Sequence, residues 1–130
     1  MSDRPNIKPN TLIPIINNTS MATSITGPVT NVFLIPGISY DLVWTGSPTG
    51  TFQVQVSNSY VPNADGTPGV AGSWSTLPVS SFAGTYPVPS GSPGNGFLDV
   101  VGTEAAWVRL VYTASGGTGN LTVVAAAKVL

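Results

Sequence analysis

Short runs of alternating apolar and polar residues, closed off by Gly and Pro, constrain this chain more than any other feature. In residues 51 to 57 the apolar side chains of Phe52, Val54 and Val56 alternate with two glutamines. Successive side chains of a β-strand point to opposite faces, so this period of two predicts a half-buried strand. With 15 Gly and 12 Pro in 130 residues, the strands must be short. The pattern predicts an all-β protein.

Further runs of this kind occur at residues 30–35, 40–45, 73–79, 97–101, 107–113 and 121–129. We expect residues 40–45 and 51–57 to form a hairpin, and residues 107–113 and 121–129 to form a second, closing hairpin. Both faces of residues 107–113 are apolar, which indicates a central strand. Seven or eight short strands of this type predict a single β-sandwich with a jelly-roll-like or other two-sheet topology.

The first part of the chain has a different character. Pro5, Pro9 and Pro14 disfavour a helix over residues 1–20, and the segment is too apolar for a solvated tail. We expect an extended N-terminal arm over residues 1–20 and a sandwich domain over residues 21–130. Either the arm pairs as an edge strand of its own domain or it lies on a neighbouring subunit. The second placement makes its apolar residues partner contacts: Ile7, Leu12, Ile13, Ile15 and Ile16.

Ionisable side chains are scarce. No Lys or Arg lies between Pro9 and Val108, the chain has no His or Cys, and only 7% of its residues are charged. Enzymes usually need groups that titrate or attack near neutral pH, so we expect no enzyme, no catalytic residues and no cofactor or metal site. Nucleic acids and anionic membranes are recognised by clustered bases, so neither is an expected partner.

The acidic residues form no recognisable catalytic pattern. Asp99 and Glu104 could supply a glycosidase pair, but nothing around them suggests a cleft, and the simpler interpretation is a strand end and a solvated loop. Residues 63–66 (NADG) resemble the start of a calcium loop, yet the downstream glutamate is missing. An ordinary Asx turn is favoured there.

Two other features are candidate sites. Residues 58–72 form the longest polar interval, a predicted contact or ligand loop with Tyr60, Asp65 and Trp74 as its candidate residues. Arg109 is the only base between Lys8 and Lys128. It either forms an ion pair, with Asp99 or Glu104 as the nearest carboxylates in sequence, or covers Trp107 with its stem. A sugar-stacking platform is a further alternative to aromatic core packing for these side chains: Trp44, Trp74, Trp107, Tyr60 and Tyr86.

Four segments taken together resemble a β-domain of tailed-bacteriophage virion proteins. They are TGTFQVQVSNSY, GSWSTLPV, SGSPGNGFLDV and AAWVRLVYTASGGTGNLTVVAAAKV, and the likeness spans residues 40 to 129. In that family a strand with Gln or Lys alternation ends in Ser-Asn, and a Trp strand follows. A further strand and a Trp-Ile/Val-Arg motif then lead into a Tyr-Thr, Gly-rich hairpin. Residues 1–20 lie outside the resemblance.

The resemblance implies a virion structural protein. Proteins similar to this occur as head decoration (cement) proteins or as tail and fibre components. The apolar arm favours decoration, in which the chain stabilises the head by bridging major capsid proteins, with a homotrimer as the expected assembly. A tail or fibre component with a receptor or carbohydrate-binding role is the alternative. No apolar signal segment follows the N-terminal charges, so we expect synthesis in the host cytoplasm and a final place on the exterior of the phage head.

Overall fold

The computed structural model describes residues 11–32, 37–65, 67–78, 86–101 and 105–127. All regular structure in these ranges is β-strand. The strands are β1 (Thr11–Ser20), β2 (Ile25–Thr26), β3 (Thr30–Asn31), β4 (Gly37–Trp44), β5 (Thr49–Ser57), β6 (Val61–Pro62), β7 (Pro68–Val70), β8 (Ser75–Thr76), β9 (Gly94–Val101), β10 (Trp107–Gly116) and β11 (Asn120–Ala127). A helix long and apolar enough to cross a membrane does not occur in the part of the chain described.

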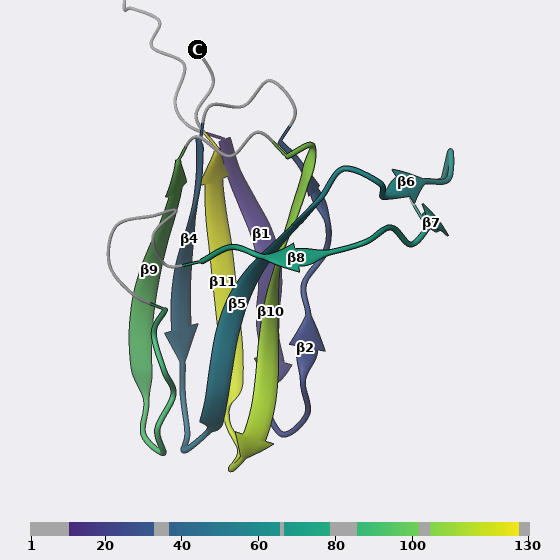
Figure 1. Ribbon diagram of the computed structural model, residues 1–130. Helices are drawn as coiled ribbons and strands as arrows, with labels where there is room; N and C mark the ends of the chain where they lie inside the picture. The colour runs from purple at the N-terminus through teal and green to yellow at the C-terminus, as the bar shows by residue number, and fades with distance from the viewer. Residues whose placement is uncertain (1–10, 33–36, 66, 79–85, 102–104, 128–130) are drawn as a thin grey trace, which may run out of the picture.

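Two sheets face each other and form a jelly roll (Figure 1). The four-stranded sheet has the order β1-β11-β4-β9, and the five-stranded sheet has the order β2-β10-β5-β8 with β3 also paired to β10. Following the chain, β1, β4, β9 and β11 lie in one sheet, and each is succeeded or preceded by a strand of the other sheet. The strand order in each sheet, in which early strands lie beside late ones (β1 beside β11, β2 beside β10), is that of a jelly roll. The predicted all-β sandwich with jelly-roll-like topology is confirmed.

The inward faces of the two sheets supply the core. In the five-stranded sheet, β10 pairs antiparallel with β5, so that Leu110 lies opposite Val54 and Tyr112 opposite Phe52, and all four side chains are buried. The ring of Phe52 lies 5.0 Å from that of Tyr112 and 5.7 Å from that of Trp44, which joins the two sheets. The alternation predicted for residues 51–57 is therefore present, and β10 is a central strand, as expected.

The two predicted hairpins are wrong. β4 pairs with β11 and β9, whereas β5 pairs with β10 and β8, so residues 45–48 cross from one sheet to the other. The same holds for β10 and β11, which lie in different sheets. The two crossing loops bond to each other instead: the Ser47 amide donates to the Thr118 carbonyl at 2.7 Å, and the Thr45 amide to the Asn120 carbonyl at 3.0 Å.

Glycine is required where these two loops touch. A Cβ added at Gly119 would overlap the carbonyl oxygen of Thr45, and one added at Gly46 would lie 2.5 Å from the carbonyl oxygen of Thr118. Backbones this close leave no room for a side chain. The glycines that predicted hairpin turns are therefore needed for the close contact between two loops that cross from one sheet to the other.

We predict that Gly119→Ala lowers the free energy of unfolding by about 2 kcal/mol or more, since an extra carbon in a packed contact forces the backbones apart. Gly91→Ala is the matched control: Gly91 has a φ of +95° but nothing within 4 Å of an added Cβ. Its cost comes from backbone strain alone, about 1 kcal/mol. Urea unfolding measures both; a Gly119→Ala cost no larger than that of Gly91→Ala would contradict the loop contact.

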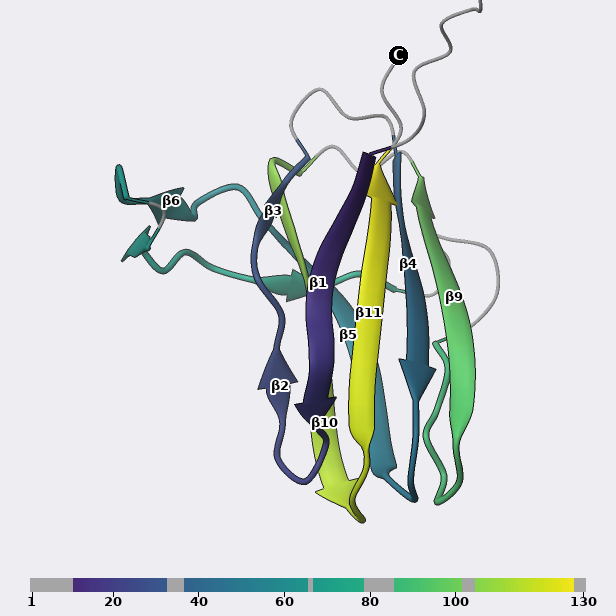
Figure 2. The same cartoon turned by 180° about the vertical axis from the view of Figure 1, so that it is seen from behind.

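The second half of the predicted arm belongs to the sandwich. β1 pairs antiparallel with β11 from Thr11 to Ser20, as the edge strand of the four-stranded sheet (Figure 2). A register shift between Pro14 and Ile16 is a β-bulge, which turns both Ile15 and Ile16 toward the core. The boundary expected after residue 20 therefore needs correction, because β1 is part of the sandwich.

Burial also decides which arm residues can contact a partner. Ile15 and Ile16 are buried within their own chain, so the prediction that they bind a partner is wrong for this fold. Ile13 is half-buried and packs against the core. Leu12 is 70% exposed and stays a candidate contact. Ile7 lies outside the described residues.

Tyr40 places a hydroxyl inside the core without a hydrogen bond. Its side chain is fully buried, and its hydroxyl oxygen has no hydrogen-bond partner among the described residues. Tyr112 is equally buried, but its hydroxyl donates to the Thr49 carbonyl at 3.0 Å. A buried polar group without a partner loses its hydration and gains nothing in return. The two tyrosines thus form a natural comparison.

We predict that Tyr40→Phe raises the free energy of unfolding by about 1 kcal/mol, whereas Tyr112→Phe lowers it by a similar amount. Burial also raises the pKa of Tyr40 above its ordinary value. Above about pH 10 the unfolded chain then releases a proton that the folded chain keeps, so stability falls as pH rises, and Tyr40→Phe removes part of that fall. Thermal unfolding from pH 7 to 11 tests both points; a destabilised Tyr40→Phe variant would contradict them.

Candidate functional site

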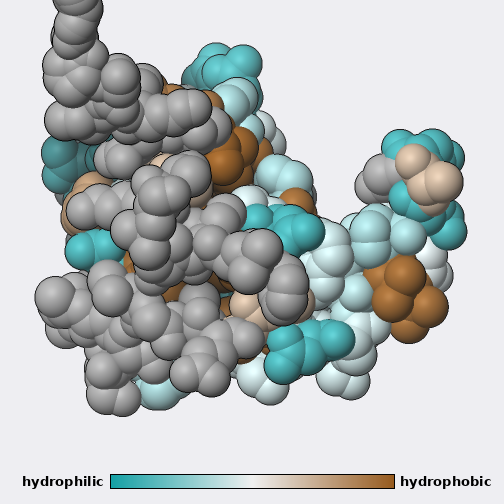
Figure 3. All heavy atoms as spheres, turned by 90° about the horizontal axis from the view of Figure 1, so that it is seen from above, coloured by the Kyte–Doolittle hydropathy of each residue, from teal (hydrophilic) through white to brown (hydrophobic). Residues whose placement is uncertain are grey.

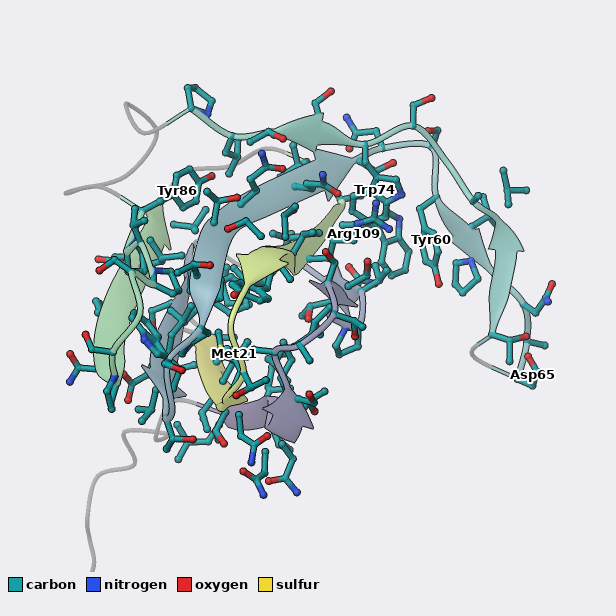
Figure 4. The ribbon with its side chains drawn as sticks, turned by 90° about the horizontal axis from the view of Figure 1, so that it is seen from below. Met21, Tyr60, Asp65, Trp74, Tyr86 and Arg109 are labelled. Atoms are coloured by element: carbon teal, nitrogen blue, oxygen red, sulfur yellow. The ribbon has the colours of Figure 1, made fainter. Side chains whose placement is uncertain are left out.

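An aromatic cluster built around one arginine lies on the outer face of the five-stranded sheet. Three of the predicted site residues, Tyr60, Trp74 and Arg109, meet there (Figure 4). The ring of Tyr60 lies 5.8 Å from that of Trp74 and 5.1 Å from that of Trp107, and the Cζ of Arg109 lies 4.1 Å from the centre of the Trp74 ring. We call Tyr60, Trp74, Trp107 and Arg109 the Arg109 cluster.

Strand alternation turns Arg109 outward, because its neighbours Val108 and Leu110 face the core. Gln55 lies directly opposite on β5, and the Nε of Arg109 donates to the Gln55 Oε1 at 2.9 Å. The guanidinium plane then stacks on Trp74, whose indole N–H donates to the Ala71 carbonyl at 2.9 Å. Arginine is suited to both contacts, because its planar fork combines hydrogen bonding with stacking.

A turn after β5 positions Tyr60. The buried Ser57 hydroxyl accepts hydrogen bonds from the amides of Ser59 at 3.1 Å and Tyr60 at 3.2 Å. The Ser59 hydroxyl in turn accepts from the Ser73 amide at 2.7 Å, which ties the start of residues 58–72 to its end. The two ends of the long loop are thus joined beside the sheet, and Tyr60 is only 8% exposed.

Arg109 does not form the predicted ion pair with Asp99. Asp99 faces outward from β9 in the four-stranded sheet, whereas Arg109 faces outward from β10 in the other sheet, so the whole sandwich separates them. Glu104 lies outside the described residues. The other sequence-based interpretation, in which the Arg109 stem covers Trp107, did not include Trp74. Trp74 contacts Arg109 in the structure, and it comes from a segment distant in sequence. Partial burial lowers the pKa of Arg109 from its ordinary value.

A cleft of about 480 Å³ opens beside this cluster. Its walls are Thr26 at the end of β2, residues 27–29, which connect β2 to β3, and Tyr60, Ala71 and Arg109. Arg109 is its only charged side chain among the described residues, and Pro28, Val29, Ala71 and the Tyr60 ring make the walls mostly apolar. A cleft of this size and lining matches the general properties of small-ligand sites. We call it the Arg109 cleft.

Asp65 does not join the cluster. Residues 58–72 project from the sandwich as the β6–β7 hairpin, which stands clear of the two sheets when seen from above (Figure 3), and Asp65 lies at its tip (Figure 4). Its Oδ1 accepts from the amide of Thr67 at 3.0 Å and from its hydroxyl at 2.6 Å, as in an Asx turn. These bonds lower the pKa of Asp65. No group of three potential metal ligands occurs within the described ranges.

The broader sugar-stacking platform is not assembled. Trp44 is 5% exposed within the core, and the Tyr86 hydroxyl donates to the Leu77 carbonyl at 2.7 Å while accepting from the Val54 amide at 3.0 Å. The face of Trp74 is occupied by Arg109. Tyr86 lies well away from Trp74 (Figure 4). Tyr60, Trp74 and Trp107 therefore pack together in the Arg109 cluster, whereas Trp44 and Tyr86 pack elsewhere.

Sequence reasoning missed a second surface, the outer face of the four-stranded sheet. Apolar side chains from all four strands are exposed on it: Leu12, Val43, Phe97 and Val124. Antiparallel pairing places Val124, Asp41 and Phe97 in one row across three neighbouring strands. Asp41 and Asp99 are its acids. We call this surface the Phe97 face. The sequence did contain one signal of this surface. Val43 alternates with Leu42 and Trp44, which point inward, so an apolar side chain was expected on the outer face beside Asp41.

Comparisons with known proteins give similarities of fold only. No protein-family model matches the chain, and no curated protein matches it in sequence. Among solved structures, it is similar to the SPBc2 prophage-derived protein YomS (TM-score 0.46, 14% identity, 98% of this chain and 100% of that one). It is also similar to a protein of infectious bursal disease virus, strain Gx (TM-score 0.46, 15% identity, 98% and 33%).

A third similarity is to the K1 cleaved adhesin domain of Lys-gingipain from Porphyromonas gingivalis W83 (TM-score 0.40, 12% identity, 82% of this chain and 63% of that one). At TM-scores below 0.5, none of these three likenesses bears on function.

We predict that Arg109 and Trp74 are energetically coupled. In a double-mutant cycle of Arg109→Met and Trp74→Leu, urea unfolding should give a coupling energy of about 0.5–1 kcal/mol, the usual strength of a partly exposed cation–π contact. The cycle removes the Gln55 bond from the result, because Arg109→Met loses that bond in both backgrounds. Additive effects within about 0.3 kcal/mol would contradict the stacking.

Proposed function

We propose that this chain is a non-enzymatic virion structural protein, a decoration or cement protein that binds the exterior of a phage head and stabilises it by bridging major capsid proteins. The Phe97 face is the observation that supports this most. It is a sheet surface with exposed apolar side chains on every strand and no described element crossing it (Figure 2). Apolar patches on exposed surfaces mark sites of protein association.

The composition of the Phe97 face suits a protein partner. Phe97 is 61% exposed and lies opposite Asp41, with Val124 on the far side of Asp41. A large apolar side chain at the centre of an interface and polar groups around it are the usual arrangement. The face has two acids and no base among its described residues, so a complementary partner surface would be apolar and carry a base.

Other properties agree with a shell protein. The sequence resembles the tailed-phage virion β-domain over residues 40–129, and jelly rolls occur in viral capsid domains among other proteins. Leu12, exposed near the start of the edge strand β1, would add to the contact. A homotrimer at the three-fold positions of the shell is the assembly that we propose, because closed symmetry repeats one contact.

The test is co-sedimentation of the purified protein with capsids of its own phage that lack it, followed by heating of the particles. Saturable binding and a higher capsid melting temperature are expected. Absence of binding would refute the decoration role.

A tail or fibre component with a receptor-binding role is the second candidate, favoured by the projecting β6–β7 hairpin. Val61 and Val70 on this hairpin are exposed, and its position away from the sandwich gives it access to a surface beyond the particle. In this case the hairpin, and not the Phe97 face, would carry the contact.

Two matched variants test which surface carries the capsid contact. We predict that Phe97→Thr weakens capsid binding at least tenfold, because it removes the largest exposed apolar side chain of the face, a contact worth more than about 1.4 kcal/mol. Val70→Thr makes a similar change on the hairpin and should leave capsid binding unchanged. Both side chains are exposed, so neither change should alter the unfolding temperature appreciably. Loss of capsid binding in Val70→Thr with full binding in Phe97→Thr would place the capsid contact on the hairpin and contradict the role of the Phe97 face.

A further inference from the structure

The Arg109 guanidinium has unused hydrogen-bonding capacity. A guanidinium carries five N–H groups, and the bond to Gln55 uses the one on Nε. Across the described part of the chain, no carboxylate pairs with Arg109, and the contact with Trp74 is a cation–π contact with the ring and not a hydrogen bond. A cation that is partly removed from water and lacks a counter-ion is a costly arrangement that an incoming anion would relieve.

The cleft beside it fits one kind of anion. Arg109 is the only base in the described chain, so a phosphate dianion would find a single cationic partner. A carboxylate carries one charge and matches the guanidinium fork with two parallel hydrogen bonds. The volume of about 480 Å³ exceeds what a carboxylate alone needs. The remaining walls, formed by Pro28, Val29 and Ala71, suit apolar atoms attached to it.

The walls favour a peptide over a sugar acid. Sugar rings stack on open aromatic faces and use many hydrogen-bonding groups. In the Arg109 cleft Tyr60 is only 8% exposed, and Arg109 already covers a face of Trp74. Besides Arg109, the side chains of the lining that can hydrogen-bond are those of Thr26 and Tyr60. An acidic residue with apolar neighbours matches this lining better.

We infer that the Arg109 cleft is a docking site for an acidic segment of a partner protein. The carboxylate of an Asp or Glu pairs with the Arg109 fork, and a neighbouring apolar side chain packs against Pro28, Val29 and Ala71. Gln55, through its hydrogen bond to Nε, and the Trp74 ring beside Cζ hold the guanidinium in place. The site is on the other sheet from the Phe97 face, so it is independent of the proposed capsid contact.

The first experiment compares two probes that differ only in the charged group, phenylacetate and phenylacetamide, by NMR titration of the intact protein. Phenylacetate should shift the indole N–H signal of Trp74 with a Kd of about 1 mM, as expected for a ligand of this size, and phenylacetamide should bind at least tenfold more weakly. Equal binding of the two probes, or no shift with phenylacetate at 20-fold this concentration (about 20 mM), would overturn the inference.

Variants then locate the site. Arg109→Met should abolish phenylacetate binding. Arg109→Lys keeps the charge but loses the fork, so binding should fall several-fold and become more sensitive to salt. Circular dichroism confirms that each variant is folded. Asp65→Asn, at the tip of the hairpin, is the control and should bind as the unchanged protein does. Binding that survives Arg109→Met would overturn the inference, even if that variant is less stable.

A final comparison separates the two sources of a carboxylate. The peptide acetyl-Phe-Glu-Phe-amide should bind more tightly than phenylacetate and more tightly than its Gln counterpart, whereas glucuronate should bind more weakly than the peptide. A glucuronate Kd below that of the peptide would overturn the assignment to a protein partner. None of these measurements needs a capsid, so their failure is distinguishable from failure of the proposed decoration role.

Discussion

The jelly roll depends on the direct contact between the two loops that cross from sheet to sheet at one end of the sandwich. Residues 45–48 lead from β4 to β5, and residues 117–119 lead from β10 to β11. Facing sheets lie about 10 Å apart, and an extended residue spans about 3.3 Å, so loops this short have just enough length to cross. The two loops cross with their backbones in direct contact. This contact fixes the positions of the ends of β4, β5, β10 and β11.

The alternation of side chains predicted most of the strands, and in residues 51–57 it correctly predicted that Phe52 and Val54 face inward. Pairing was harder to predict. A short Gly-rich connection has the same composition whether it turns within one sheet or crosses between two, and only the contact of Gly119 with Thr45, distant in sequence, distinguishes the cases. The bulge that buries both Ile15 and Ile16 is a similar case, since it interrupts the period on which the prediction depends.

The candidate site was predictable in part. The sequence identified both the polar interval at residues 58–72 and the isolated Arg109 as candidate sites. The structure brings Tyr60, Trp74 and Arg109 together. The partner of Arg109 was not predictable, because Gln55 and Trp74 reach it through strand register and through a loop that returns to the sheet. Neighbouring residues in sequence, such as Asp99, were poor guides because each connection to the opposite sheet moves them to the far side of the sandwich.

The two outer faces of the sandwich consequently differ. The five-stranded sheet has its own cover in Tyr60 and Trp74, whereas the four-stranded sheet exposes Phe97 and its neighbours. This asymmetry is the basis of the account, and hydroxyl-radical footprinting of the protein free and bound to its capsid tests it most directly. The account predicts that Leu12 and Phe97 become protected on binding while Val61 and Val70 stay reactive. Protection confined to the β6–β7 hairpin, with Phe97 as reactive as in the free protein, would contradict it.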